Sequence, residues 1–382
     1  MAYSLRTFGS NEINLLCGGL HYLQPEDYPG AVELLAEAGC TEVDTARMYL
    51  EKTAEGKLGA ARRELPQEVV DSMTIDTKVK PLSLSPPSLP THTRHHRTAG
   101  CWGPHVTPAT RGEQVNPGES LSYDGVIAQA RTCLAELGVS SVDILYLHSP
   151  DPDNVLEESL RAANDLHRDG CFRRLGLSNY PAWQLTQAYY KAKELGWVLP
   201  SVYQGMYNPL MRQVEQEILP ACEMLGVRFV AYSPLAAGLL QDPWATGGPP
   251  PPNGQASGPE REGLQPRLTV STFMRGEHSA RRGRASDPEV LRRAVERAEA
   301  GCSAAGISLR EAAMRWHFHH SALKPHDGII VGLTRGDPAM VADNIETAKR
   351  AHESPLPPAV LAAMDGAWEE EISGPPGYPS PE

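Results

Sequence analysis

Ionisable side chains recur at one kind of place in this sequence, at the ends of short apolar runs. Asp44 follows one run, Lys78 ends the next and His148 follows a third, while Tyr49 comes shortly after Asp44. A phenol, with an ordinary pKa of about 10, is a poor acid unless a nearby cation eases its ionisation. Tyr49 and Lys78 would supply such a proton donor. Asp44 would hold the ammonium as its ion partner, and His148 would donate a hydrogen bond to a reacting group.

The same apolar runs define the elements that must position these groups. Runs of strand length alternate with helical patterns, which is typical of βαβ units and a parallel sheet. The predicted strands span residues 14–18, 41–45, 73–78, 142–147, 173–177, 202–204, 228–232 and 328–331. Helical patterns lie between them, at 28–38, 125–137, 156–168, 181–195, 215–225 and 290–305. A unit repeated about eight times predicts an α/β fold, a (β/α)8 TIM barrel.

Further polar residues follow the later strands, namely Ser178, Asn179, Gln204 and Ser233. In a barrel, the carboxyl ends of all strands meet at one edge, where active sites are built. A strand-end Asp alone is often a helix cap, and a lone Lys or His is usually an ordinary surface group. Their shared position is what favours a site. No G-x-G-x-x-G follows any strand, which argues against a Rossmann dinucleotide site.

Composition excludes several classes of partner. The chain of 382 residues carries 35 Lys and Arg against 47 Asp and Glu, a net charge of −12. That balance argues against nucleic acid or an anionic membrane, and no apolar run approaches the ~18 residues needed to span a bilayer. The seven cysteines are scattered without a C-x-x-C pair, and no signal-peptide layout opens the sequence. We therefore expect reduced thiols and a cytoplasmic protein.

Proline-rich stretches interrupt the regular pattern. Many of the 34 prolines fall within residues 81–120, 243–266 and 355–381. The first two lack any apolar period, so we interpret 82–119 as a disordered insertion and 236–286 as a second long loop. A last short helix is expected near 359–371. Residues 1–372 are predicted to form one barrel domain, and 373–382 a tail.

Six motifs come in an order that resembles a known family. "VDTARMY", "TK", "LHSPD", "GLSNY", the Gln of "SVYQ" and "AYSPLAAGLL" are similar to the aldo-keto reductase superfamily, especially its aflatoxin aldehyde reductase-like branch. The resemblance implies a (β/α)8 barrel that binds a nicotinamide dinucleotide without a Rossmann motif. It also implies carbonyl reduction, in which Tyr49 donates the proton and Lys78, Asp44 and His148 complete the catalytic set.

The resemblance implies cofactor contacts as well. Ser178, Asn179 and Gln204 match the residues that recognise the nicotinamide carboxamide, which needs paired donors and acceptors. Tyr232 matches an aromatic residue that stacks on the nicotinamide ring. The alternatives are that Ser178 and Asn179 only cap the following helix and that Tyr232 is a core aromatic at a strand end. The turn that contains Ser233, Leu235 and Gly238 would present backbone amides to the pyrophosphate.

The adenosine end of the cofactor is assigned to the last strand and the helix after it. Asn344 matches the family's adenine-side Asn, and Thr334 and Arg335 fall where phosphate-binding residues lie. An Arg fork suits a phosphate monoester, which favours NADPH. Arginines also crowd the second long loop, and they are either solvated or in contact with the cofactor phosphates.

The insertion at 82–119 departs from the family pattern. It contains four histidines and Cys101, but their spacing fits no standard zinc pattern, so no metal is predicted. A solvated loop and an imperfect gene model are both open explanations.

We therefore predict an NADPH-dependent reductase of a small-molecule carbonyl substrate, with a homodimer carried over from the resemblance. The alternative is a dinucleotide-binding regulatory barrel with little turnover. The intact catalytic set favours the enzyme.

Overall fold

A closed barrel of parallel strands forms the centre of the molecule. The computed structural model describes residues 14–18, 28–37, 40–81, 120–241, 288–332 and 338–373. The strands pair in sequence order, and β1 closes the ring against β8. They are β1 (Asn14–Gly18), β2 (Glu42–Asp44), β3 (Thr74–Val79), β4 (Val142–Leu147), β5 (Phe172–Ser178), β6 (Pro200–Met206), β7 (Arg228–Tyr232) and β8 (Gly328–Gly332). The predicted (β/α)8 barrel is confirmed.

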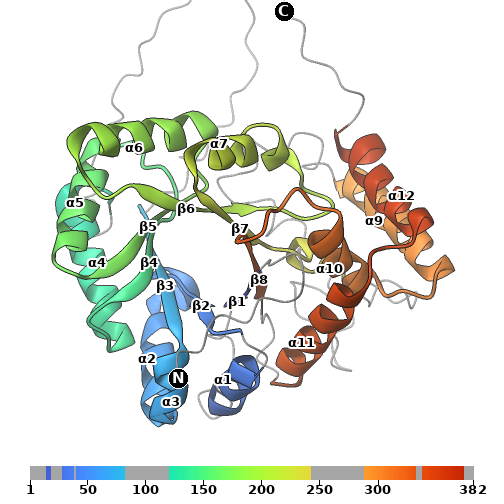
Figure 1. Ribbon diagram of the computed structural model, residues 1–382, viewed down its shortest axis with the longest axis horizontal. Helices are drawn as coiled ribbons and strands as arrows, with labels where there is room; N and C mark the ends of the chain where they lie inside the picture. Colours follow the sequence, from blue (N-terminus) through green and yellow to red (C-terminus); the bar gives the residue numbers. More distant parts are fainter. Residues whose placement is uncertain are drawn as a thin grey trace, which may run out of the picture.

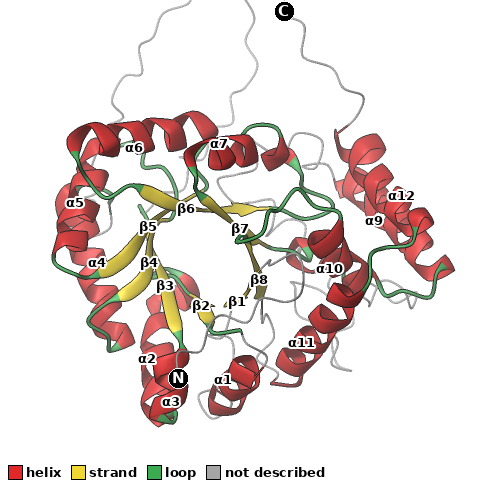
Figure 2. Cartoon of the chain, in the orientation of Figure 1, coloured by secondary structure: helices red, strands yellow, loops and turns green. Residues whose placement is uncertain are grey.

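Helices surround this ring on the outside (Figures 1 and 2). The longer ones are α1 (Tyr28–Glu37), α2 (Ala54–Glu64), α4 (Tyr123–Leu137), α5 (Leu156–Arg168), α6 (Ala182–Leu195), α7 (Ile218–Leu225), α9 (Pro288–Ala304), α10 (Leu309–His319), α11 (Pro338–Glu353) and α12 (Pro358–Gly366). The shorter ones are η3 (Tyr49–Lys52), α3 (Gln67–Ser72), η5 (Gln213–Glu215), η6 (Ala236–Gly238) and the π-helical η11 (Ala367–Ser373). None of the described helices is long and apolar enough to cross a membrane.

Local signals in the sequence set where the helices begin and end. The Ser122 hydroxyl accepts a hydrogen bond from the Gly125 amide and caps α4, as expected for a Ser at this position. Three helices end at glycines with a left-handed backbone, Gly138, Gly196 and Gly226, with φ of 66°, 65° and 66°. Glycine adopts this conformation without steric cost. Each of these glycines turns the chain back toward the next strand.

One predicted helix is divided in the structure. The pattern at 215–225 predicts a continuous helix, whereas η5 ends at Glu215 and α7 begins only at Ile218. Pro220 explains the break, because a proline ring clashes with the carbonyl four residues earlier and lacks an amide proton. The helix can therefore start just before Pro220 but cannot extend far in front of it.

The apolar core has two parts. A large layer lies between the strands and the surrounding helices. A smaller cluster fills the inside of the barrel, made of Leu16, Ile144, Tyr146, Val202, Val230 and Ile330. The barrel is therefore a packed core and not a pore, and its functional groups lie at its ends.

The proline-rich predictions lie mostly outside the described residues. This holds for 82–119, for 242–287 within the second loop, and for 374–382 within the tail. The expected last helix is present as α12 followed by η11.

Candidate active site

Three neighbouring strands deliver the predicted catalytic side chains to the same edge of the barrel. β2 ends at Asp44, β3 carries Lys78 as its penultimate residue, and His148 directly follows β4. Tyr49 opens the short helix η3 that follows β2. Because the strands are parallel and in register, these four residues from separate segments converge.

A buried ion pair forms the centre of this edge. The Lys78 Nζ lies 2.5 Å from Asp44 Oδ2 and 2.8 Å from the carbonyl oxygen of Thr45, to which it donates. The Lys78 side chain is fully buried and that of Asp44 is 5% exposed. Gln204, on the opposite side of the ring in β6, donates its Nε2 to Asp44 Oδ1 at 2.8 Å. Both carboxylate oxygens of Asp44 therefore accept hydrogen bonds.

The pair keeps its charges because each member compensates for the burial of the other. Burial lowers the pKa of Lys78, but the Asp44 carboxylate and the Tyr49 phenol more than reverse this, so the pKa of Lys78 is raised overall. Burial raises the pKa of Asp44, and the Lys78 ammonium and the Gln204 amide oppose only part of that rise, so the pKa of Asp44 stays above its ordinary value. The lysine is accordingly an ammonium at neutral pH.

Tyr49 and His148 lie beside this ammonium. The Lys78 Nζ is 5.3 Å from the centroid of the Tyr49 ring. The rings of Tyr49 and His148 meet edge to face, with centroids 6.0 Å apart and an angle of 79° between their planes. The structure thus brings together the four residues that were predicted to be catalytic. A phenol, an ammonium and an imidazole at these distances can move one proton to a bound oxygen.

A second set of polar side chains adjoins the first. Ser178 ends β5, and Asn179 follows it with a left-handed φ of 63°. Asn179 donates its Nδ2 to Ser178 Oγ and to the backbone oxygen of His148, each at 3.0 Å, and accepts a 2.8 Å bond from the Tyr232 hydroxyl. Gln204, predicted to recognise the cofactor with this set, donates its amide nitrogen to Asp44. It therefore links the two sets.

The turn after β7 has the backbone shape of an anion-binding loop. Ser233, Ala236 and Gly238 all have left-handed φ values, of 56°, 48° and 96°. Turns of this shape can present backbone amides to a phosphate, although the amides of Ala236 and Gly238 bond to carbonyl groups within the turn. A side chain built on Gly238 would meet no atom of the described residues within 4 Å. The Gly238 amide itself donates to the Leu235 carbonyl at 2.9 Å and thereby shapes the turn.

The remaining predicted cofactor residues divide into two groups. Asn344 lies in α11 and is 7% exposed. Thr334 and Arg335 lie outside the described residues, as do the arginine-rich loop and the histidine-containing insertion. The proposed 2′-phosphate contacts therefore stay predictions from the sequence.

Tyr146 is a neighbour of the site that sequence reasoning missed. Its ring is fully buried inside the barrel, and its centroid lies 5.6 Å from Lys78 Nζ. Gly176 lies opposite it in β5, and a Cβ at Gly176 would come within 2.2 Å of the Tyr146 ring. The run "DILYL" resembles any apolar strand. The available signal was a glycine in the following strand, which marks close approach of a large side chain.

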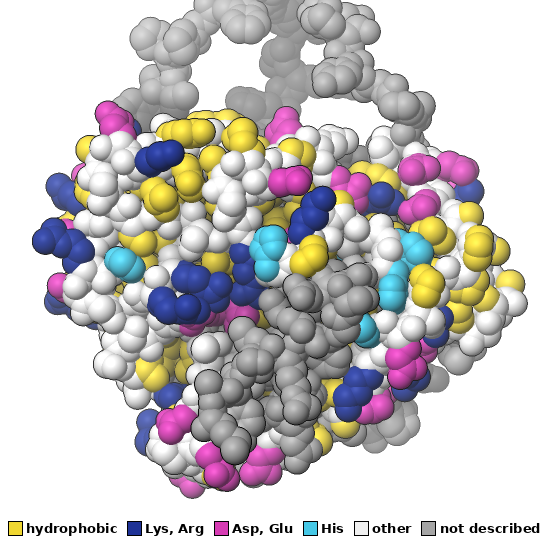
Figure 3. Space-filling view, in the orientation of Figure 1, with side chains coloured by type: hydrophobic (Ala, Val, Ile, Leu, Met, Phe, Trp, Pro, Cys, Tyr) yellow, Lys and Arg dark blue, Asp and Glu magenta, His cyan; other side chains and the backbone are white. Residues whose placement is uncertain are grey.

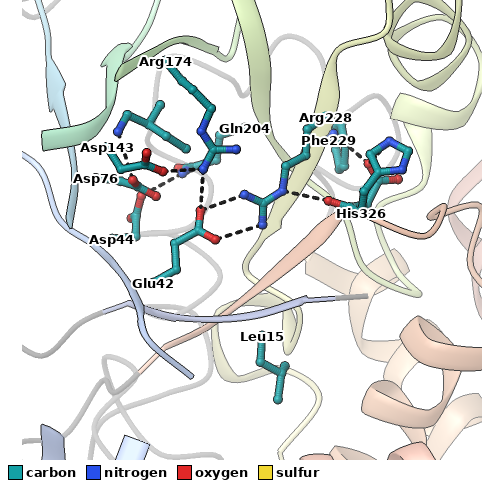
Figure 4. Close-up of polar contacts among 12 residues, drawn as sticks. Leu15, Glu42, Asp44, Asp76, Asp143, Arg174, Gln204, Arg228, Phe229 and His326 are labelled. Carbon is teal, nitrogen blue, oxygen red and sulfur yellow. Dashed lines mark hydrogen bonds and ion pairs between the residues drawn. The ribbon is translucent and has the colours of Figure 1, made fainter. Parts of the chain in front are cut away.

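A layer of largely buried charges lies toward the amino ends of the strands, at the end of the barrel opposite the catalytic set (Figure 4). Arg228 in β7 binds Glu42 in β2 through two hydrogen bonds, of 2.8 and 3.1 Å. Arg174 in β5 bonds to Asp143 and lies 3.7 Å from Glu42. Burial and the nearby carboxylates hold the pKa of Asp76 well above its ordinary value of 3.8. In the space-filling view, basic side chains gather beside acidic ones near the middle of the face shown (Figure 3).

The three carboxylates of this layer raise the question of a metal. Oxygens of Glu42, Asp76 and Asp143 lie within 4.8 Å of one another. However, the guanidinium groups of Arg228 and Arg174 already bind two of them, which supplies the positive charge that a cation would bring. We therefore propose no metal here.

Comparison with known proteins connects this geometry to a family. A family model described as the aldo/keto reductase family matches residues 8–369. The chain is similar to human aldo-keto reductase family 7 member A3, with 33% identity over 334 residues, 87% of this chain and 86% of the relative. It is 36% identical to human aflatoxin B1 aldehyde reductase member 4 over 264 residues, 67% of this chain and 73% of the relative. Rat aflatoxin B1 aldehyde reductase member 2 is 32% identical over 349 residues, 91% of this chain and 81% of the relative. The matched stretch contains every residue of the site described above.

Proposed function

The chain belongs to the aldo/keto reductase family, and from that premise we propose that it reduces aldehyde or ketone carbonyls to alcohols with NADPH, with Tyr49 as the proton donor. Members of this family are NAD(P)H-dependent oxidoreductases. The observation that supports Tyr49 as the proton donor is the buried Lys78–Asp44 pair, whose ammonium lies 5.3 Å from the centroid of the Tyr49 ring.

The chain's own residues account for the movement of the proton. Reduced nicotinamide supplies the hydride when it is bound. As negative charge develops on the carbonyl oxygen, the Tyr49 hydroxyl gives up its proton to that oxygen. The Lys78 ammonium stabilises the phenolate that is left, because little water reaches this buried site to screen the attraction. Asp44 keeps the ammonium in place, and His148 would orient the carbonyl through a hydrogen bond.

The chemistry of the neighbouring groups fits a nicotinamide dinucleotide. Amide and hydroxyl groups from Ser178 and Asn179 adjoin the catalytic set, and the half-buried Tyr232 hydrogen-bonds to the same Asn179. These would hold the carboxamide and face the ring. The left-handed turn from Ser233 to Gly238 would bind the pyrophosphate.

The names of the relatives point to a substrate class. Several are aflatoxin B1 aldehyde reductases, and we propose that this chain likewise acts on aldehydes. The preference for NADPH over NADH rests on Thr334, Arg335 and Asn344. The homodimer stays a prediction, which sedimentation of the purified chain would test.

The decisive experiment is Tyr49→Phe. We expect NADPH-dependent reduction of an aldehyde panel to fall by about 10² to 10⁴ in kcat, with the Kd for NADPH nearly unchanged, because the hydroxyl acts on the substrate and not on the cofactor. Tyr190→Phe, at an exposed tyrosine of α6, is the matched control and should keep full activity. An unchanged kcat for Tyr49→Phe would refute the assignment. If the wild-type chain instead bound NADPH without reducing any of the panel, the regulatory alternative would be favoured.

A further inference from the structure

Two buried side chains hydrogen-bond to consecutive carbonyl groups of the turn that follows β7. Asn208 donates its Nδ2 to the carbonyl oxygen of Ser233 at 3.0 Å. His317 in α10 bonds through Nε2 to the carbonyl oxygen of Pro234 at 3.4 Å. Both side chains are completely buried. Neither bond belongs to a strand or helix ladder, so both are specific to this turn.

The orientation of Asn208 is fixed by its other bonds. Its Oδ1 accepts the Leu210 amide at 3.0 Å, and its backbone exchanges hydrogen bonds with Met211. Since the side-chain oxygen is engaged by an amide donor, the nitrogen must be the atom that faces Ser233.

The orientation and charge of His317 are fixed as well. Its ring meets the rings of Tyr207 and Trp316 edge to face, with centroid distances of 5.8 and 5.3 Å. A carbonyl oxygen only accepts, so Nε2 must carry the proton that it donates to Pro234. Nδ1 is buried and has no hydrogen-bond partner among the described residues. A second proton there would have no acceptor in this part of the chain, which keeps the ring neutral.

Holding the Pro234 carbonyl has a consequence for the next amide. The described peptide bonds are all trans, so the carbonyl of Pro234 and the amide of Leu235 point in opposite directions. With its carbonyl turned toward α10, this peptide must direct the Leu235 amide away from α10. The amides of Ala236 and Gly238 are already engaged within the turn, and the Leu235 amide is the group whose direction the bond from His317 sets.

We propose that His317 and Asn208 are positioning residues for the cofactor: they fix the Ser233–Leu235 segment so that the Leu235 amide is presented to the pyrophosphate. The inference rests on the proposed function, since it concerns the same dinucleotide site. It predicts that loss of either bond weakens ligands that contain a pyrophosphate and spares ligands that lack one.

The test measures binding and not turnover. His317→Met removes the donor but keeps an apolar side chain of similar size, and His317→Gln keeps a donor near the Nε2 position. His319→Met is the matched control, because His319 lies in the same helix and bonds through Nε2 to the carbonyl of Ala351 at 3.0 Å. Calorimetric Kd values would be measured for NADPH, ADP-ribose and 2′-AMP, the last of which has no pyrophosphate.

We expect His317→Met to weaken NADPH and ADP-ribose by about 3- to 10-fold, the range of one hydrogen bond, and to leave 2′-AMP unchanged. His317→Gln should recover most of the affinity, and His319→Met should alter none of the three. Equal weakening of all three ligands, or no weakening, would overturn the inference. If His317→Met does not fold, Asn208→Ser decides between the same outcomes. Failure of the wild-type chain to bind NADPH would count against the proposed function itself.

Discussion

Removing the Lys78 ammonium alone should destabilise the fold more than removing both charges of the Lys78–Asp44 pair. Lys78→Met leaves a carboxylate that is 5% exposed, with Gln204 as its remaining described partner. Breaking a buried pair in this way typically costs about 3 to 5 kcal/mol, whereas replacing both members by neutral groups is often nearly neutral. The variant that combines Lys78→Met with Asp44→Asn should therefore be more stable than Lys78→Met alone, although both lack activity.

The predicted loss of stability in Lys78→Met should depend on pH. Burial raises the pKa of Asp44, and Lys78→Met removes the main group that opposes the rise. A carboxyl whose pKa in the folded state exceeds that in the unfolded state favours folding most below the unfolded pKa, and this contribution is lost as the pH rises. The free energy of unfolding of Lys78→Met, relative to that of wild type, should accordingly decrease as the pH rises above about 3.9, the ordinary pKa of an aspartic acid.

Urea unfolding followed by circular dichroism would measure these differences, with NADPH oxidation measured on the same samples. Lys193→Met, at an exposed lysine of α6, is the control and should change stability by less than about 0.5 kcal/mol. The reasoning is refuted if the double variant loses as much stability as the two single variants added together, or if it keeps full kcat.

Three further predictions follow from other features. NADPH should bind about 10- to 100-fold more tightly than NADH because Arg335 can pair with the 2′-phosphate, and equal Kd values in a fluorescence titration would reject this. Replacing residues 82–119 by a short polar linker should preserve the melting temperature and NADPH binding, since loop closure depends only weakly on length; loss of either would make the segment a working part of the site. Burial lowers the pKa of His317 to about 4, below the usual value of about 6.5, so the unfolded chain gains the proton first on acidification. Wild-type stability relative to His317→Gln should therefore fall by about 3 kcal/mol from pH 7 to pH 4 in urea titrations, and a constant difference would contradict the neutral buried ring.

The strands could be predicted from the sequence because their signal is local. The apolar runs predicted at 14–18, 142–147 and 228–232 coincide with β1, β4 and β7, and the other strands differ from prediction by at most two residues at either end. The convergence of the catalytic side chains followed from the same pattern, since parallel strands bring their carboxyl ends to one edge. The residue types also indicated an ion pair, because a lysine inside an apolar strand is rarely tolerated without a partner.

What could not be predicted depends on closure of the ring. Gln204 bonds to Asp44 across 160 residues of sequence, and Arg228 bonds to Glu42 across 186. No local pattern marks such pairs, because each member resembles an ordinary charged or polar residue beside a strand. His317 was missed for a related reason: one more histidine in the run "WHFHH" carries no sign that it alone is turned toward the loop after β7.

The charged layer near the amino ends of the strands also bears on how the chain folds while it is being synthesised. Glu42, Asp76 and Asp143 all lie in the first four strands, whereas Arg174 and Arg228, which bond to Asp143 and Glu42, come later. At ~5 to 20 residues per second, the ribosome needs roughly 10 to 40 s to travel from Glu42 to Arg228. During that time a half-built barrel would have to bury the Glu42 carboxylate without Arg228, which is unfavourable. We therefore expect the nascent chain to disfavour closing around its first strands until Arg228 is available to pair with Glu42.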